Sequence, residues 1–190
     1  VRRHEFRDIF KEKLDLHHIP ALSNVLYSED ILFPIADFYL KKERWNEAIE
    51  VYEEMETIGA LQGRGAEYYQ KLGYALQKNK KYAEAIDAYL KADTLKPDNI
   101  WNNRHLAICY RLNRNYQAAL SYYKKVEEAT PEDTNVIFHI GSCLAELGQY
   151  EEAANYFFKL DFIESNCIKA WRGIGWCSFI SRKYEQAMKY

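Results

Sequence analysis

Tyr82-Ala-Glu-Ala85-Ile-Asp-Ala-Tyr89 is the most informative segment of this sequence, because close copies of it recur at a fixed interval. One copy begins at Tyr116 and reads YQAALSYY, and another begins at Tyr150 and reads YEEAANYF. The intervals from Tyr82 to Tyr116 and from Tyr116 to Tyr150 are both 34 residues. A constant period of this length is typical of proteins built from repeated helical hairpins.

Two further copies of the segment lie on either side of these three. A fourth copy begins at Tyr184, again 34 residues later, and a fifth begins at Trp45, which lies 37 residues before Tyr82. We expect the three additional residues in the glycine-rich turn at 63–65. The chain is therefore divided into an array at 29–190, with repeats at 29–62, 66–99, 100–133 and 134–167 and a partial repeat at 168–190.

Small residues recur at two positions of every repeat. The eighth position is glycine or alanine (Ala36, Gly73, Ala107, Gly141, Gly175), and the twentieth is always alanine (Ala48, Ala85, Ala119, Ala153, Ala187). The twenty-fourth is aromatic in the four full repeats (Tyr52, Tyr89, Tyr123, Phe157). Apolar residues recur at steps of three and four, which indicates helices buried on one face. Each repeat is therefore predicted to be two closely packed helices, with the aromatic residue filling the gap to the next repeat.

The expected helix ends carry residues that suit them. Asn79, Asn113 and Gly148 lie where the first predicted helix of their repeats must stop, and all three residue types tolerate the left-handed conformation that ends many helices. Pro97 and Pro131 occupy the thirty-second position of two repeats, where proline stops the second helix.

These repeated positions resemble the tetratricopeptide repeat, whose pattern is W-x2-L-G-x2-Y…A-x3-F…P. The repeat at 66–99 matches best, through Leu72, Gly73, Ala85, Tyr89 and Pro97. The chain departs from the pattern at Asn103, Ser165 and Ser178. The resemblance covers residues 29–190 and implies an all-α, right-handed α-solenoid of helix-turn-helix repeats. It also implies a function in protein–protein recognition.

Residues 1–28 do not fit the repeat frame. Phe6, Ile9, Phe10 and Leu14 form an apolar face at helical spacing, so we expect an N-terminal capping or linking helix. The sequence has no initiator methionine, and Tyr190 falls inside the helical pattern of the last repeat. We interpret the chain as part of a larger protein.

The composition is that of a globular protein without a dominant charge. Of the 190 residues, 48% are hydrophobic, and the formal net charge is −2. Such a chain lacks the basic field that attracts nucleic acid or anionic membranes, and no run of about 18 apolar residues is present to span a bilayer. We expect neither nucleic acid nor a membrane as a partner. Four cysteines without close pair spacing favour a cytoplasmic location.

No group of residues indicates catalysis, a metal or a cofactor. Cys109, Cys143 and Cys177 share the tenth position of successive repeats, where equivalent helices lie about 10 Å apart. This is too far for a disulfide or a shared zinc ion, so we expect these thiols in the core and Cys167 in a partly exposed turn. The glycine clusters follow no predicted strand, as a phosphate-binding loop would. We expect a protein that is not an enzyme and has no metal or cofactor.

The first helix of each repeat lines the concave face of tetratricopeptide arrays, chiefly through its second, fifth, ninth, twelfth and thirteenth residues. The resemblance therefore implies a peptide-binding face made of Gln70, Tyr74, Trp101, Arg104, Ile108, Arg111, Asn135, Phe138, Ser142, Lys169, Arg172 and Trp176. Aromatic side chains alternate with basic ones along this face. The pattern favours a protein or peptide partner with acidic residues and apolar anchors.

Other functions stay open at this point. Tetratricopeptide domains that bind chaperone tails use a carboxylate clamp, which Arg104 and Lys169 resemble but Ile108 and Gly173 do not. The segment 138–148 is similar to bacterial secretion chaperones with tetratricopeptide repeats. A third alternative is the substrate-recruiting domain of an enzyme whose catalytic part lies elsewhere. Neither the identity of the partner nor the oligomeric state follows from the sequence.

Overall fold

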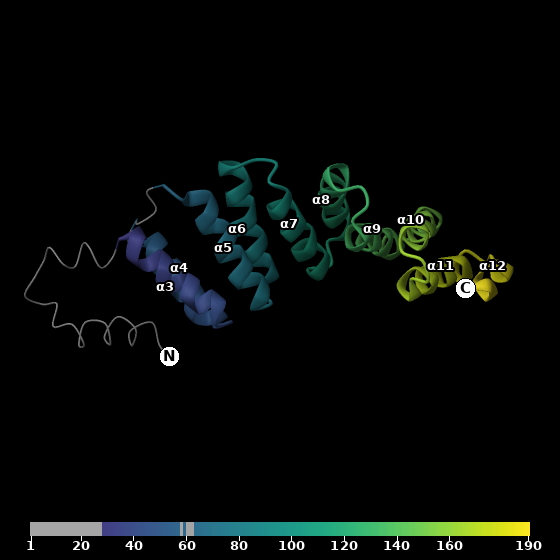
Figure 1. Ribbon diagram of the computed structural model, residues 1–190, viewed down its shortest axis with the longest axis horizontal. Helices are drawn as coiled ribbons and strands as arrows, with labels where there is room; N and C mark the ends of the chain where they lie inside the picture. Colours follow the sequence, from purple (N-terminus) through teal and green to yellow (C-terminus); the bar gives the residue numbers. More distant parts are fainter. Residues whose placement is uncertain (1–27, 58, 60–62) are drawn as a thin grey trace, which may run out of the picture. The chain divides into compact units, whose positions relative to one another are not determined.

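The computed structural model describes residues 28–57, 59 and 63–190 (Figure 1). These residues form ten α-helices, and they include no β-strand. The predicted all-α helical repeat solenoid is confirmed. The predicted capping helix, at residues 1–28, lies outside the described residues except for Ser28.

The described residues fall into two compact units. The first ends at Leu95 and contains α3 (Glu29–Lys41), α4 (Trp45–Thr57), α5 (Gly65–Lys78) and α6 (Tyr82–Leu95). The second spans Lys96–Tyr190 and contains α7 (Ile100–Leu112), α8 (Tyr116–Ala129), α9 (Thr134–Glu146), α10 (Tyr150–Ile163), α11 (Ile168–Ile180) and α12 (Tyr184–Lys189). In both units, successive helices pair as hairpins, from α3 with α4 to α11 with α12.

Side chains cap the first helices of two hairpins of the second unit, α7 and α9. Asn99 accepts a hydrogen bond from the backbone N–H of Asn102 at 3.0 Å, before α7. Asp133 accepts bonds from the N–H groups of Asn135 and Val136 at 3.0 and 3.1 Å, before α9. These bonds satisfy backbone donors that have no partner inside the helix.

The turn between the two helices of each repeat has its left-handed residue at the fifteenth position. The φ angle is 56° at Glu43, 62° at Lys80, 61° at Arg114, 78° at Gly148 and 60° at Arg182. The predicted helix ends are confirmed, because Asn79 and Asn113 directly follow α5 and α7, but their φ angles are −80° and −85°, and of the three residues only Gly148 is left-handed. In each turn the N–H after the left-handed residue bonds to a carbonyl five residues back, as from Asn115 to Tyr110 at 2.8 Å. This C-terminal geometry requires the left-handed residue one position after the asparagine.

Glycine allows very close packing inside two hairpins. A β-carbon at Gly73 would lie 2.8 Å from Cε1 of Tyr89, and one at Gly141 would lie 2.9 Å from Cε1 of Phe157. The aromatic residue at the twenty-fourth position thus packs against the backbone of the eighth residue. This confirms the predicted close approach of the two helices.

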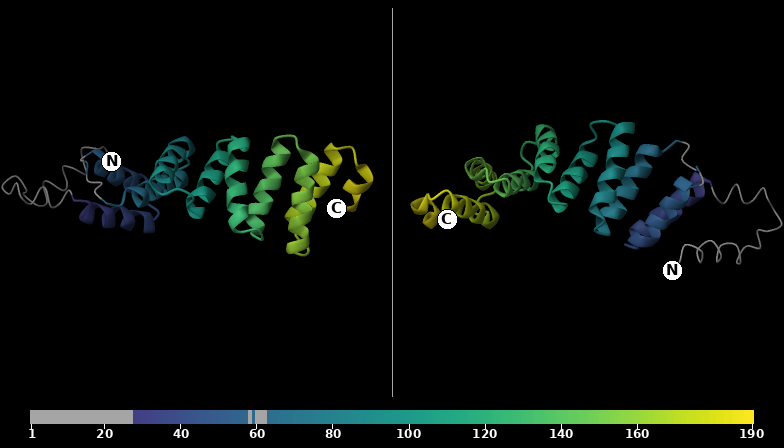
Figure 2. Two further views of the ribbon diagram at one scale, coloured as in Figure 1. Left: turned by 90° about the horizontal axis from the view of Figure 1, so that it is seen from above. Right: turned by 180° about the vertical axis from the view of Figure 1, so that it is seen from behind.

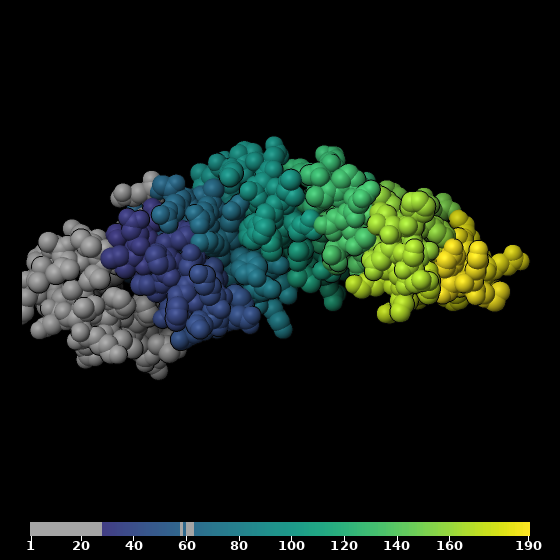
Figure 3. Space-filling model, in the orientation of Figure 1, coloured from purple at the N-terminus to yellow at the C-terminus, as the bar shows by residue number. Residues whose placement is uncertain are grey.

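The core of the second unit extends through its three hairpins. The largest cluster of buried side chains includes Leu120 from α8, Ile140 and Leu144 from α9, Phe157 from α10 and Ile174 from α11. Figure 2 shows the helices of this unit side by side, and in the space-filling view of Figure 3 their side chains close the spaces between the ribbons. The first helices of the last two hairpins, α9 and α11, also touch each other. Their exposed sides therefore form one surface.

Candidate functional site

A groove of about 850 Å³ lies along α9 and α11 and continues to α12. Five of the predicted peptide-binding residues line it. Phe138 and Ser142 come from α9, and Lys169, Arg172 and Trp176 come from α11. The structure therefore brings together in one groove side chains that are up to 38 positions apart in the sequence, from 138 to 176.

The groove combines exposed aromatic surface with positive charge. Trp176 keeps 60% of its surface exposed, which is unusual for so large an apolar side chain. The Lys169 ammonium lies 5.7 Å from the centre of the Phe138 ring, a distance at which a cation is attracted to the ring face. Arg172 is exposed on α11. The acidic Glu146 lies at the edge of the same groove.

Arg104 on α7 has a different role from the cations of α11. Its Nη2 atom donates to Oδ2 of Asp133 at 2.7 Å, and both side chains are partly buried. Asp133 is also the residue that caps α9. The Arg104 charge is therefore partly neutralised inside the protein, and its contact holds the start of α9 against α7.

The pKa of His139 on α9 depends on burial and on the charges near the groove. Its pKa is lowered to about 4, first by burial and then by the positive charges of Arg111 and Lys169. The ring stacks on Tyr123 with the two ring centres 5.6 Å apart. At neutral pH the imidazole is uncharged, so it adds no positive charge of its own behind the groove.

The remaining predicted residues lie elsewhere. In the second unit, Trp101 is 42% exposed on α7, Ile108 packs partly into the core, and Asn135 is exposed on α9. Gln70 and Tyr74 lie on α5 in the first unit, so the groove of the second unit does not contain them.

Sequence reasoning missed several lining residues of the groove. These are Ala145, Phe157, Gly173, Gly175, Tyr184, Ala187 and Met188. Most of them are apolar residues that the repeat pattern assigns to packing between helices. The large exposed fractions of Tyr184 and Met188, 54% and 81%, are not visible in the sequence.

All four cysteines are buried with free thiols. This confirms the core positions predicted for Cys109, Cys143 and Cys177, whereas the partly exposed turn predicted for Cys167 is wrong. Cys167 precedes α11 and packs with Ile137 and Leu160 in a small cluster, which leaves only 6% of it exposed. Among residues 28–57, 59 and 63–190, no three histidine, cysteine or acidic side chains gather in a way that would hold a metal ion.

Solved structures with the same fold include two MamA proteins. MamA from Desulfovibrio magneticus RS-1 is 18% identical with a TM-score of 0.75, and the match covers 84% of this chain and 89% of that one. A MamA designated MSR-1 is 25% identical with a TM-score of 0.73, over 88% and 92% of the two chains. A tetratricopeptide repeat protein from Parabacteroides merdae ATCC 43184 is 18% identical with a TM-score of 0.73, over 84% and 62%. These likenesses support the fold.

A comparison with curated proteins found no match. None of the helices in the described ranges has both the length and the apolar character needed to cross a membrane. Profiles described as tetratricopeptide repeat match residues 32–62, 66–99 and 111–177. Arrays of such repeats are protein-interaction scaffolds, and this is the general function of the protein. The chain belongs to the tetratricopeptide repeat family.

Proposed function

We propose that the groove of the second unit binds a segment of a partner protein that carries carboxylates beside a large apolar side chain. One observation carries this proposal: Lys169 and Arg172 lie with Phe138 and Trp176 around a single groove within one compact unit. Aromatic anchors and arginine are the residues that most often dominate the energy of protein interfaces.

The apolar part of the contact centres on Trp176 and Phe138. Trp176 is more than half exposed, so a partner side chain packed on it removes apolar surface from water. Phe138 is half-buried and holds the Lys169 ammonium near its ring. An aromatic or aliphatic side chain of the partner would lie between these two rings.

The charged part of the contact depends on α11. Lys169 and Arg172 are three residues apart, so they lie on the same side of the helix. Both side chains are exposed to solvent, so they would attract a carboxylate of the partner across water. Such an attraction weakens as the salt concentration rises. Arg104 contributes less, because Asp133 already compensates its charge.

The test uses a peptide selected from a displayed library of acidic and aromatic sequences. Its affinity is measured by fluorescence anisotropy against the parent protein, Lys169→Glu/Arg172→Glu and Trp176→Ala. We expect both variants to bind at least about tenfold more weakly, which corresponds to about 1.4 kcal/mol. The matched control is Lys124→Glu/Lys125→Glu, which makes the same charge change on exposed residues of α8.

The control also separates groove binding from general charge attraction. Equal weakening by both double variants would mean that the peptide responds to net charge alone. Unchanged binding by Trp176→Ala together with Lys169→Glu/Arg172→Glu would place the peptide site on another surface and reject the proposal.

A further inference from the structure

The charged residues of the groove are divided between its two ends. Lys169 and Arg172 are the second and fifth residues of α11, and Glu146 is the last residue of α9. The chain reverses its direction at 147–149 and again at 164–167, so α9 and α11 run parallel. The two cations therefore lie where these helices begin, and Glu146 lies where they approach their ends.

The distance along the groove keeps the opposite charges apart. Glu146 and Ile180 are 34 positions apart, so they are equivalent residues of two parallel helices and lie at about the same level. Ile180 is eight residues beyond Arg172, which corresponds to roughly 12 Å along a helix. Glu146 is therefore too far from Arg172 for the two charges to pair with each other.

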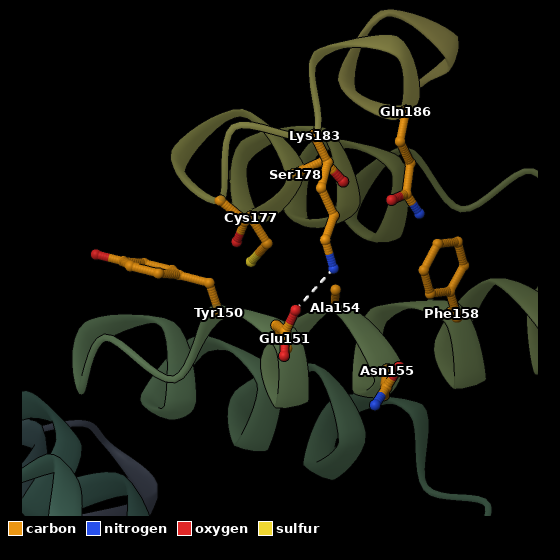
Figure 4. Close-up of a pocket in the computed structure, with 10 residues that line it drawn as sticks. Tyr150, Glu151, Ala154, Asn155, Phe158, Cys177, Ser178, Lys183 and Gln186 are labelled. Atoms are coloured by element: carbon orange, nitrogen blue, oxygen red, sulfur yellow. Dashed lines mark hydrogen bonds and ion pairs between the residues drawn. The ribbon is translucent and has the colours of Figure 1, made fainter.

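Opposite charges in a smaller cavity of the same unit are arranged differently. This cavity, of about 290 Å³, lies between α10 and the segment from α11 to α12, and Ala154 and Ser178 line it (Figure 4). Lys183 and Glu151 lie 2.8 Å apart across it and pair with each other. It shares no lining residue with the groove. The groove thus differs from it in presenting separated charges.

Helix stability does not explain where the charges of the groove lie. Anions stabilise the first turn of a helix and cations stabilise its last turn, because the N-terminus carries a partial positive charge. Lys169 and Glu146 are placed the opposite way. Within α9 and α11, which the structure describes in full, no acidic residue lies in the first turn and no basic residue in the last. The helix dipoles therefore have the same polarity as the side-chain charges of the groove.

Aromatic side chains follow the cations along the groove and reach the level of Glu146. Trp176 comes first, one turn beyond Arg172. Phe179 and Tyr184 follow, each more than half exposed, with their ring centres 6.0 Å apart. This end of the groove therefore offers a carboxylate together with aromatic rings, and both kinds of group attract a guanidinium.

We propose that the partner segment carries an arginine on the side of its apolar anchor opposite to its carboxylates. The arginine would pair with Glu146 and lie against Phe179 and Tyr184. The carboxylates would pair with Lys169 and Arg172. This inference rests on the function proposed for the groove, and it adds the charge order of the partner.

The dimensions of the groove give the spacing of these three groups. An extended segment advances about 3.3 Å per residue, so roughly four residues cover the distance between the charged ends. Side chains at every second position of such a segment point to the same side. A carboxylate, an apolar side chain and an arginine at alternate positions would therefore all face the groove.

The test compares three fluorescein-labelled peptides by fluorescence anisotropy with the protein of residues 1–190. The first, Asp-Glu-Gly-Trp-Gly-Arg, has the proposed spacing. The second has glutamate in place of the arginine. The third, Asp-Glu-Arg-Gly-Trp-Gly, has the same composition as the first with the arginine moved next to the carboxylates. We expect the first to bind at least about fivefold more tightly than the third, because only the first places its arginine near Glu146.

Charge reversal at Glu146 tests the contact itself. Glu146→Lys should change the ratio of the affinities for the first and second peptides at least about fivefold in favour of the second, as in a double-mutant cycle. Its melting temperature should not fall, because lysine is favoured at the end of a helix. The matched control Glu128→Lys makes the same change at the exposed next-to-last residue of α8 and should alter the ratio much less.

The outcomes separate this inference from the function on which it rests. Weaker binding by Lys169→Glu/Arg172→Glu together with an unchanged ratio in Glu146→Lys would reject the arginine contact and keep an acidic segment in the groove. Equal affinities for the first and third peptides would reject the spacing. Unchanged binding by Lys169→Glu/Arg172→Glu, or no binding by any peptide, would reject the groove proposal and this inference together.

Discussion

The ring of Phe157 on α10 lies so close to Gly173 on α11 that a β-carbon at Gly173 would be 2.6 Å from Cγ of the ring. The same ring limits Gly141 on α9, where a β-carbon would be 2.9 Å from Cε1. One aromatic side chain thus packs against glycines of two successive hairpins. Gly175, also on α11, has no such contact, because its nearest neighbour atom would be 3.8 Å from a β-carbon.

This difference predicts opposite effects of two identical substitutions on one helix. Gly175→Ala should stabilise the protein by about 0.5–1 kcal/mol, because alanine favours a helix interior over glycine. Gly173→Ala has the same gain but forces the Phe157 ring to move, and overpacking costs about 1–3 kcal/mol. Urea denaturation of both variants checks the difference. Equal stabilities would show that the ring moves without cost.

The left-handed turn residues predict a second pair of opposite effects. Arg114→Gly should stabilise the protein by about 0.5–1 kcal/mol, because glycine adopts a positive φ without the steric cost of a β-carbon. Gly148→Ala, at the equivalent turn, should destabilise it by a similar amount. The control Lys125→Gly lies inside α8 and should be destabilising. Stabilisation by Lys125→Gly as well would contradict the explanation based on φ.

His139 predicts a pH dependence of stability. Its pKa is lowered from 6.5 to about 4 in the folded protein, with burial as the main cause, so the unfolded chain binds more protons between these pH values. The stabilising effect is complete above pH 6.5 and is lost as the pH falls toward 4. We expect the parent to lose about 1–2 kcal/mol more than His139→Gln between pH 7 and pH 5.

Chemical denaturation of parent and variant at the two pH values measures this difference directly. Carboxylates titrate in both proteins, so their contribution cancels in the comparison. Parallel pH profiles for the parent and His139→Gln would contradict the prediction.

Asp133 makes both a helix cap and an ion pair, and two substitutions should separate their contributions to stability. Asp133→Asn keeps an oxygen that can accept from the N–H groups of α9 but removes the charge that pairs with Arg104. We expect it to cost about 0.2–1 kcal/mol, the usual range for a partly exposed pair. Asp133→Ala also removes the cap and should cost about 1 kcal/mol more. Equal melting temperatures for the two variants would mean that the cap contributes nothing.

Much of the fold follows from the sequence because each hairpin has the same kinds of packing residues at the same positions. The alanine at the twentieth position and the aromatic residue at the twenty-fourth recur in register, so the paired helices were predictable from pattern alone. The position of the left-handed residue was not, because Lys80 and Arg114 carry side chains that disfavour a positive φ. The hydrogen bonds of the turn outweigh that local preference.

The site was less predictable than the fold. Lys169, Arg172 and Trp176 were found because they occupy helix positions that repeat along one face. The pairing of Arg104 with Asp133 was not predicted, because these residues are 29 positions apart, near opposite ends of the repeat at 100–133. The cavity that Ala154 on α10 and Ser178 on α11 line together (Figure 4) could not be recognised from either small residue alone, because it depends on both residues.

The burial of the native cysteines has a practical consequence for fluorescence labelling. Burial raises the pKa of Cys109 to about 12 and that of Cys143 to about 11, and it also raises the pKa of Cys177. Thiolates are the reactive form of cysteine, so these core thiols are nearly inert toward maleimide dyes at neutral pH. A cysteine introduced at the exposed Asn135 of α9 would therefore take up dye in preference to the four buried native cysteines.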